Sequence, residues 1–201
     1  GRASESSRRA KLTRSSRVPA TSSLPVNRAC DSALRHARLH PCRQGRVGVI
    51  LRTACGDDGA AVAALWNGMI ADTLFTFTTD VKTAAEVEDL IAARADQFWV
   101  AEADGIVGFV TFGPFRSGPG YRDVVEHSIV LDKSVQGTGV GRALMQTAFD
   151  AAAAQGRRIM VAAISGANPG AIGFHTALGF GQVGRMPRIG QKNGQQLDLI
   201  L

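Results

Sequence analysis

The chain has 201 residues, of which 45% are hydrophobic and 6% aromatic, an ordinary composition for one globular domain with or without a tail. The sequence contains no run of apolar residues that approaches the roughly 18 needed by a membrane-spanning helix. A net charge of +6 suggests nucleic-acid binding at first, but the distribution of that charge argues against it for most of the chain.

The positive charge is concentrated at the N-terminal end. Residues 1–49 contain 11 Lys or Arg and two acidic residues, whereas the rest of the chain has 12 basic and 15 acidic residues. Ser, Arg and Pro are frequent over residues 1–48, and no helical or strand period is sustained there. We therefore expect a basic disordered tail or leader over 1–48 and one domain over 49–201.

Other interpretations of the tail stay open. It could be an expression leader, an electrostatic arm for nucleic acid or membrane, or an organelle transit peptide, which is also rich in Arg and Ser. The three cysteines, Cys30, Cys42 and Cys55, have neither the number of a disulfide framework nor the spacing of metal ligands. This indicates a reduced, cytoplasmic context without a structural metal.

The domain begins with a predicted strand over residues 49–52 and a helix over 57–71, where apolar residues recur at helical spacing. Thr83, followed three residues later by Glu86, is a capping box that predicts the start of a second helix.

Strands and helices alternate in the remainder. Asp104-Gly105 is typical of a hairpin turn between two strands. The expected elements are strands over 98–102, 106–112, 123–131 and 158–164, helices over 139–155 and 170–178, and a final antiparallel pair over 180–186 and 196–201. This order indicates one α/β domain around a mixed sheet.

The most informative segment is Q-G-T-G-V-G at residues 136–141, which follows a strand and begins a helix. Its glycines allow positive φ angles and a close approach of the backbone to a ligand. The free N–H groups and the dipole of the following helix favour a phosphate group. The spacing is neither that of a dinucleotide fingerprint nor that of a Walker loop. A turn that only packs the helix is the alternative.

This Q-x-x-G-x-G segment resembles the pyrophosphate-binding signature of the GNAT superfamily of N-acetyltransferases. Asn168-Pro169 and A-I-G-F-H-T-A-L-G-F at 171–180 resemble its second CoA-binding segment. Within the superfamily, V-E-H-S at 125–128, G-R-M-P at 184–187 and G-Q-K-N-G at 190–194 are similar to phosphinothricin and methionine sulfoximine or sulfone acetyltransferases.

The resemblance implies the acyl-CoA N-acyltransferase fold, in which helices flank a central mixed, mostly antiparallel sheet. It also implies acetyl-CoA as co-substrate and no metal. Acetyl-CoA would lie between two splayed strands, its pantetheine on one strand's backbone and its pyrophosphate in the glycine loop. The residues expected to bind it are Ile129, Val130, Leu131, Gln136, Gly137, Thr138, Gly139, Val140, Gly141, Arg142 and Asn168.

Two side chains are the expected catalytic groups. By the resemblance, Glu126 is the general base, acting directly or through a water, with a structural ion pair as the alternative. His175 occupies the position where many members have the Tyr that protonates the leaving thiolate, and a packing role is its alternative. The residues expected at the acceptor site are Phe77, Arg116, Ser117, Gly118, Glu126, His127 and Ser128, with Phe75 and Arg122 as further candidates. His127 could instead pack in the core.

The implied reaction is N-acetylation of a small amino acid or analogue by a cytoplasmic homodimer, without a nucleic-acid or membrane partner. Two alternatives remain: acetylation of a protein N-terminus or another amine, and a non-catalytic acyl-CoA-binding module. The chain departs from the family at Gln195-Gln196, where aromatic residues are common, at Asn193 after Lys192, and at Arg116, which has no adjacent Trp. These departures concern the amine substrate and leave the CoA chemistry unaffected.

Overall fold

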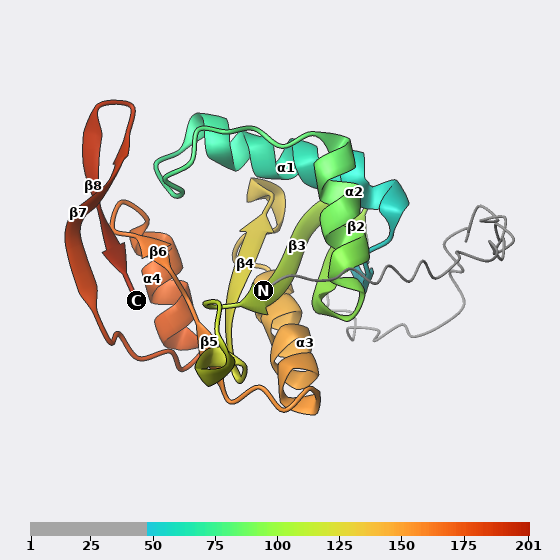
Figure 1. Cartoon of the computed structure of the whole chain (residues 1–201). Coiled ribbons are helices and arrows are strands. Elements are labelled where there is room, and N and C mark those ends of the chain that lie inside the picture. Colours follow the sequence, from blue (N-terminus) through green and yellow to red (C-terminus); the bar gives the residue numbers. More distant parts are fainter. Residues whose placement is uncertain (1–47) are drawn as a thin grey trace, which may run out of the picture. The chain divides into compact units, whose positions relative to one another are not determined.

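The computed structural model describes residues 48–201, and the predicted tail falls almost entirely outside this range. A five-stranded sheet has the order β1-β2-β3-β4-β5, and a three-stranded sheet has the order β6-β8-β7 (Figure 1). All pairs are antiparallel except β4 with β5. The strands are β1 (Ile50–Thr53), β2 (Phe98–Ala103), β3 (Gly105–Pro114), β4 (Val124–Leu131), β5 (Ile159–Val161), β6 (Ile164–Ser165), β7 (Arg185–Lys192) and β8 (Gln195–Ile200). The predicted mixed, mostly antiparallel sheet is confirmed.

In the part of the chain that the structure describes, four α-helices flank the strands. They are α1 (Gly59–Asp72), α2 (Ala84–Ala93), α3 (Val140–Ala154) and α4 (Pro169–Ala177). At the start of α2, the Thr83 hydroxyl accepts from the Glu86 N–H at 3.2 Å, and the Glu86 carboxylate accepts from the Thr83 N–H at 2.7 Å. These two bonds satisfy donors that the first helical turn leaves without partners, and they confirm the predicted capping box.

The strands bury both faces of the larger sheet in separate hydrophobic clusters. Phe109 of β3 and Val130 of β4 pack with α1 and α2, whereas Phe112 and Val125 pack with α3. Successive side chains of a strand point to opposite faces, so this division follows from alternation along β3 and β4. Burying a Phe or Val side chain contributes roughly 1.5–3 kcal/mol. The same alternation decides which functional side chains share a face.

Two predicted strands were wrong. The expected strand over 158–164 is divided into β5 and β6, which belong to different sheets, and Ile159 is 56% exposed. β5 lies at the edge of the larger sheet and pairs with β4 over only three residues, so its side chains are not enclosed. The strand expected over 180–186 begins only at Arg185, after Gly179, Gly181 and Gly184.

The final hairpin has a turn that was not predicted. β7 runs to Lys192 and β8 starts at Gln195, so Asn193 and Gly194 form the turn. Their φ angles are 50° and 75°. Asn-Gly is the dipeptide that best tolerates two successive positive φ angles, and it favours a tight hairpin. Over residues 48–201, no helix is both long and apolar enough to cross a membrane.

Candidate active site

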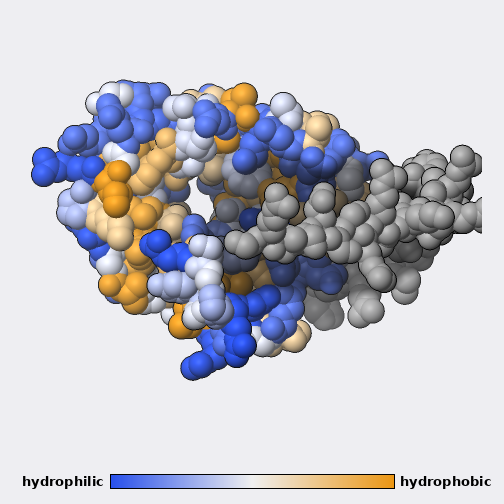
Figure 2. Space-filling view, viewed as in Figure 1, coloured by the Kyte–Doolittle hydropathy of each residue, from blue (hydrophilic) through white to orange (hydrophobic). Residues whose placement is uncertain are grey.

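β4 and β5 separate after a short stretch of pairing. Their register runs from Val124 with Ile159 to Glu126 with Val161 and then stops, while β4 stays paired with β3 as far as Leu131. The backbone of Ile129, Val130 and Leu131 therefore has no strand partner on the β5 side within the described part of the chain. Figure 2 shows an opening in the surface between the side of β4 and the side of α4 and β7–β8. An extended ligand could continue the sheet here as an added strand does.

The glycine loop lies at the end of β4 and leads into α3. Gly137 has φ 73° and Gly139 has φ 94°, both in the left-handed region. Gln136, Gly137, Thr138 and Gly139 are exposed, and α3 begins at Val140. The N–H groups of the first turn of α3 lack intrahelical partners and carry the positive end of the helix dipole. This geometry fits an anionic pyrophosphate.

Gly141 has a different role from the two glycines before it. A Cβ at this position would lie 2.8 Å from the Leu131 side chain and 3.3 Å from the Phe174 ring. Gly141 therefore lets α3 approach β4 and α4 closely. The Arg142 guanidinium, expected at the pyrophosphate, donates to the Ala177 carbonyl at 3.1 Å, at the C-terminal end of α4. Asn168 is the N-cap of α4, where its Oδ1 accepts from the Ala171 N–H at 3.0 Å.

Glu126 stands at the last paired position before the two strands separate. It pairs with Gly113 of β3, and alternation places its side chain on the α1–α2 face together with Ser128 and Val130. Glu126 is half-buried. Burial raises the pKa of its carboxyl group, and the positive charge of Arg116 partly opposes that shift. A carboxylate whose pKa is raised toward neutrality is better suited to accept a proton from an ammonium group.

His127 and His175 form a buried pair on the opposite face of β4. Their Nε2 atoms are 2.9 Å apart. The Nδ1 of His127 lies 3.0 Å from the Val161 carbonyl oxygen, and the Nδ1 of His175 lies 2.7 Å from that of Ala171. Three hydrogen bonds require three hydrogens, but two neutral imidazoles carry only two. A neutral pair therefore leaves one of these contacts without a hydrogen.

The sequence matches the acetyltransferase (GNAT) family over residues 66–180. The chain belongs to this family. It is 34% identical over 154 residues to the L-methionine sulfoximine/L-methionine sulfone acetyltransferase of Pseudomonas paraeruginosa. The aligned region covers 74% of this chain and 90% of that protein. The chain is therefore an acyltransferase.

Solved structures of other acetyltransferases agree with the assignment of this chain to the GNAT family. An acetyltransferase from Salmonella typhimurium with its cofactor acetyl-CoA superposes with a TM-score of 0.73 and 32% identity, covering 76% of this chain and 91% of that one. A phosphinothricin acetyltransferase from Sinorhizobium meliloti in complex with acetyl-CoA gives a TM-score of 0.71 and 29% identity, with 76% and 85% coverage. The expected GNAT fold is thereby confirmed.

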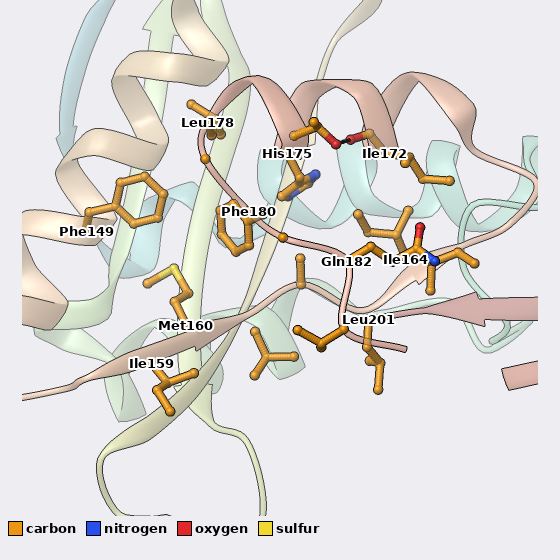
Figure 3. A pocket seen from close by; sticks show the side chains of 17 residues that line it. Phe149, Ile159, Met160, Ile164, Ile172, His175, Leu178, Phe180, Gln182 and Leu201 are labelled. Carbon is orange, nitrogen blue, oxygen red and sulfur yellow. Dashed lines mark hydrogen bonds between the residues drawn. The ribbon is translucent and has the colours of Figure 1, made fainter. Parts of the chain in front are cut away.

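The apolar hollow beside α4 in this acetyltransferase is lined mainly by β5, α4 and the segments that follow them, and Glu126 is not part of its lining. It has a volume of about 400 Å³, and its lining includes Phe149, Met160, Phe180 and Leu201 together with His175 (Figure 3). Neither β4 nor the glycine loop lines it, and it contains no acidic or basic side chain apart from His175. A charged amino acid or a pyrophosphate would be poorly solvated there.

The residues expected at the acceptor side of the acetyltransferase are distributed over several elements. Arg116 is exposed, and its Cζ lies 5.0 Å from the centroid of the Phe115 ring. The guanidinium of Arg122 is 80% exposed and lies 3.4 Å from Asp123. Ser117 and Gly118 are also exposed, in the loop after β3. Within this loop, only the positive charge of Arg116 acts on Glu126, and it lowers the pKa of the Glu126 carboxyl group.

Phe77 contacts the C-terminal hairpin. A Cβ on Gly190 of β7 would lie 2.3 Å from the Phe77 ring, so glycine at this position makes room for the ring. Nearby, Lys192 is 3% exposed and its Nζ donates to the Ile70 carbonyl at 2.6 Å. That carbonyl lies in the last turn of α1, where carbonyl groups lack helical partners and the dipole is negative. The hairpin is thus fastened to the last turn of α1 and to the segment that follows it.

Sequence reasoning missed two basic side chains of the acetyltransferase. They are Lys192, which the sequence presents only within the G-Q-K-N-G motif, and Arg94 at the end of α2. Neither has a local pattern that indicates burial, because their partners Ile70 and Thr111 lie far away in the sequence. Residues 48–201 contain no group of three or more His, Cys, Asp or Glu side chains placed to hold a metal ion.

Acidification should destabilise the acetyltransferase through His127. Burial, and secondly the charge of His175, lower the His127 pKa from 6.5 to about 4. The unfolded chain therefore binds this proton first, and the stability that the neutral imidazole contributes is complete above pH 6.5 and is lost as the pH falls toward 4. The loss should be on the order of 3 kcal/mol. Urea unfolding at several pH values measures it.

His127→Gln is the matched variant for this measurement, since it cannot titrate. Its free energy of unfolding should depend less steeply on pH over the same interval, although His175, whose pKa burial also lowers, continues to contribute. Equal slopes for the wild type and the variant would show that His127 does not titrate as described.

Proposed function

We propose that the enzyme transfers an acetyl group from acetyl-CoA to the amino group of a small amino acid or analogue of the phosphinothricin or methionine sulfoximine and sulfone type. The observation that carries the proposal is Glu126, a half-buried carboxyl group beside the β4–β5 opening, with the glycine loop at the far end of the same strand. The names of the relatives support the substrate class.

The residues on either side of the opening suit acetyl-CoA. The backbone of Ile129, Val130 and Leu131 would hold the pantetheine arm, and Gly137 to Gly141 would hold the pyrophosphate. When bound, acetyl-CoA supplies a thioester whose carbonyl carbon a neutral amine can attack. Glu126 would remove the proton from the acceptor ammonium, directly or through a water.

His175 is the proposed donor of a proton to the leaving thiolate. Both of its ring nitrogens are engaged, one with His127 and one with the Ala171 carbonyl. Donation therefore requires the contact between the two imidazoles to open and His175 to carry a second proton, on Nε2, because its Nδ1–H bonds the Ala171 carbonyl. Transfer of the Nε2 proton to the thiolate then returns His175 to its neutral form, which re-forms the contact with His127. We propose for His127 this supporting role instead of direct contact with the acceptor. Both imidazoles lie on the face of β4 opposite Glu126, so the group that His175 would protonate is the leaving thiolate and not the acceptor amine.

The oligomeric state, the compartment and the partners of the enzyme are also part of the proposed function. We propose that it works as a homodimer in a reducing cytoplasm, without a nucleic-acid or membrane partner. Support comes from the family resemblance for the dimer and from the charge distribution for the partners, since residues 50–201 are net acidic. Sedimentation equilibrium of the full chain measures the oligomeric state.

A thiol-release assay tests the reaction. The full chain is supplied with acetyl-CoA and with methionine sulfone, methionine sulfoximine, phosphinothricin or ordinary amino acids. Saturable release with the tetrahedral analogues is expected. Acetyl-CoA binding without acetylation of any small amine would refute the proposal in favour of a binding module, and turnover confined to peptide N-termini would favour the protein-acetylating alternative.

A further inference from the structure

Arg94 directs its guanidinium onto the central strand of the larger sheet. The residue ends α2, and its Nη1 donates to the Thr111 hydroxyl of β3 at 3.2 Å. A Cβ on Gly113 would lie 2.8 Å from Nη2 and 3.0 Å from Cζ of Arg94. Glycine at position 113 therefore provides the space that the guanidinium occupies.

The register between β3 and β4 places this guanidinium on the same face of the sheet as the proposed base. Gly113 pairs with Glu126, and Thr111 pairs with Ser128. Side chains at paired positions share a face, and this face is the one covered by α1 and α2. Adjacent strands are about 4.8 Å apart, so the groups above Gly113 and Glu126 are within the span of one small molecule.

The charge of Arg94 has no counter-ion in the described range. Arg52, Arg122 and Arg185 each form ion pairs with carboxylates, whereas Arg94 forms none among residues 48–201. Arg94 is half-buried, and this burial lowers the pKa of its guanidinium. Removing a cation from water is costly unless an anion or several hydrogen bonds compensate. Thr111 supplies one hydrogen bond, so most of the donors of the fork remain available.

We infer that Arg94 binds the carboxylate of the amino-acid acceptor and thereby presents the amino group of the acceptor to Glu126. This inference rests on the proposed function. In an α-amino acid the two groups are joined through one carbon, so one anchor positions both. A guanidinium is suited to this role because its planar fork donates two parallel hydrogen bonds to a carboxylate. Arg116 and Arg122 are exposed, and water competes with their ligands more strongly.

The test compares an acid with its uncharged analogue. Steady-state kinetics are measured for Arg94→Gln with methionine sulfone and with methionine sulfone carboxamide, which keeps the amine but lacks the carboxylate. The KM for the acid should rise roughly 10- to 100-fold, the loss expected for a charge-assisted pair of hydrogen bonds. The KM for the carboxamide and that for acetyl-CoA should change little. Arg158→Gln, which removes an exposed arginine just before β5, is the matched control.

Each result separates this inference from the proposed function. Turnover of methionine sulfone by the wild type with an unchanged KM in Arg94→Gln would overturn the role of Arg94 alone. Equal losses for acid and carboxamide, accompanied by a lower melting temperature, would assign Arg94 a purely structural role. Turnover of no carboxylate-bearing amine by the wild type would refute both. Arg94→Lys keeps the positive charge but lacks the planar guanidinium, so its KM for the acid should lie between those of the wild type and Arg94→Gln. This variant tests the inference if Arg94→Gln fails to fold.

Discussion

Replacing Glu126 by Gln should lower kcat by roughly 10²- to 10⁴-fold, the contribution typical of a general base. The amide has nearly the same shape but cannot accept a proton from the ammonium group. Acetyl-CoA affinity should be retained, because the glycine loop is at the other end of β4. Thiol release at saturating acceptor measures kcat, and calorimetric titration with acetyl-CoA measures binding.

The pH profile gives an independent check on the same residue. Burial raises the pKa of Glu126, so its ionised form becomes dominant at a higher pH than for a free glutamate. Activity of the wild type should therefore rise with pH through that raised pKa, and this limb should disappear in Glu126→Gln. Glu88→Gln, at an exposed position of α2, is the control and should behave as the wild type. A Glu126→Gln enzyme with normal kcat would exclude this base.

Replacing Gly139 by Ala should raise the KM for acetyl-CoA at least tenfold while the acceptor KM changes little. Gly139 has φ 94°, a conformation that costs a residue with a Cβ roughly 1–2 kcal/mol. No other group lies within 4 Å of the added Cβ, so the effect comes from the backbone of the loop. The strained turn would redirect the N–H groups that are proposed to hold the pyrophosphate.

Gly156 provides a closely matched control for that experiment. It follows α3, has φ 72°, and also has open space around its missing Cβ. Gly156→Ala should therefore reduce stability by a similar amount without changing the KM for acetyl-CoA. Thermal melting and initial rates distinguish the two effects. If both variants raised the KM equally, general strain and not the loop would be responsible.

The features that the sequence predicts correctly are those whose interacting residues lie close together in the chain. The capping box at Thr83 and Glu86 joins residues three apart, and the turn at Asp104-Gly105 depends on the local backbone. The strand, glycine loop and helix around residues 124–154 are likewise consecutive in the chain. Such features follow from nearest-neighbour geometry, so a single sequence is sufficient to predict them.

One of the two failed strand predictions has a tertiary cause. An apolar run at 158–164 is compatible with one continuous strand, but the larger sheet accepts it only as far as Val161, where β4 and β5 separate. The chain then joins a second sheet at Ile164. The strand expected over 180–186 fails for a local reason, because the Asn193-Gly194 dipeptide itself indicates a hairpin turn and places the strand at Arg185–Lys192.

The sequence by itself determined the family, the glycine loop before α3 and the candidacy of Glu126, because these depend on residue types at fixed short spacings. Only the tertiary structure decided that His127 faces His175, that Lys192 fastens the hairpin to α1, and that Arg94 lies against Gly113 on the same face as Glu126. Those contacts join residues 19 to 122 positions apart. They exist because strand order and register bring particular faces together, and the spacing of residues along one chain does not specify that order.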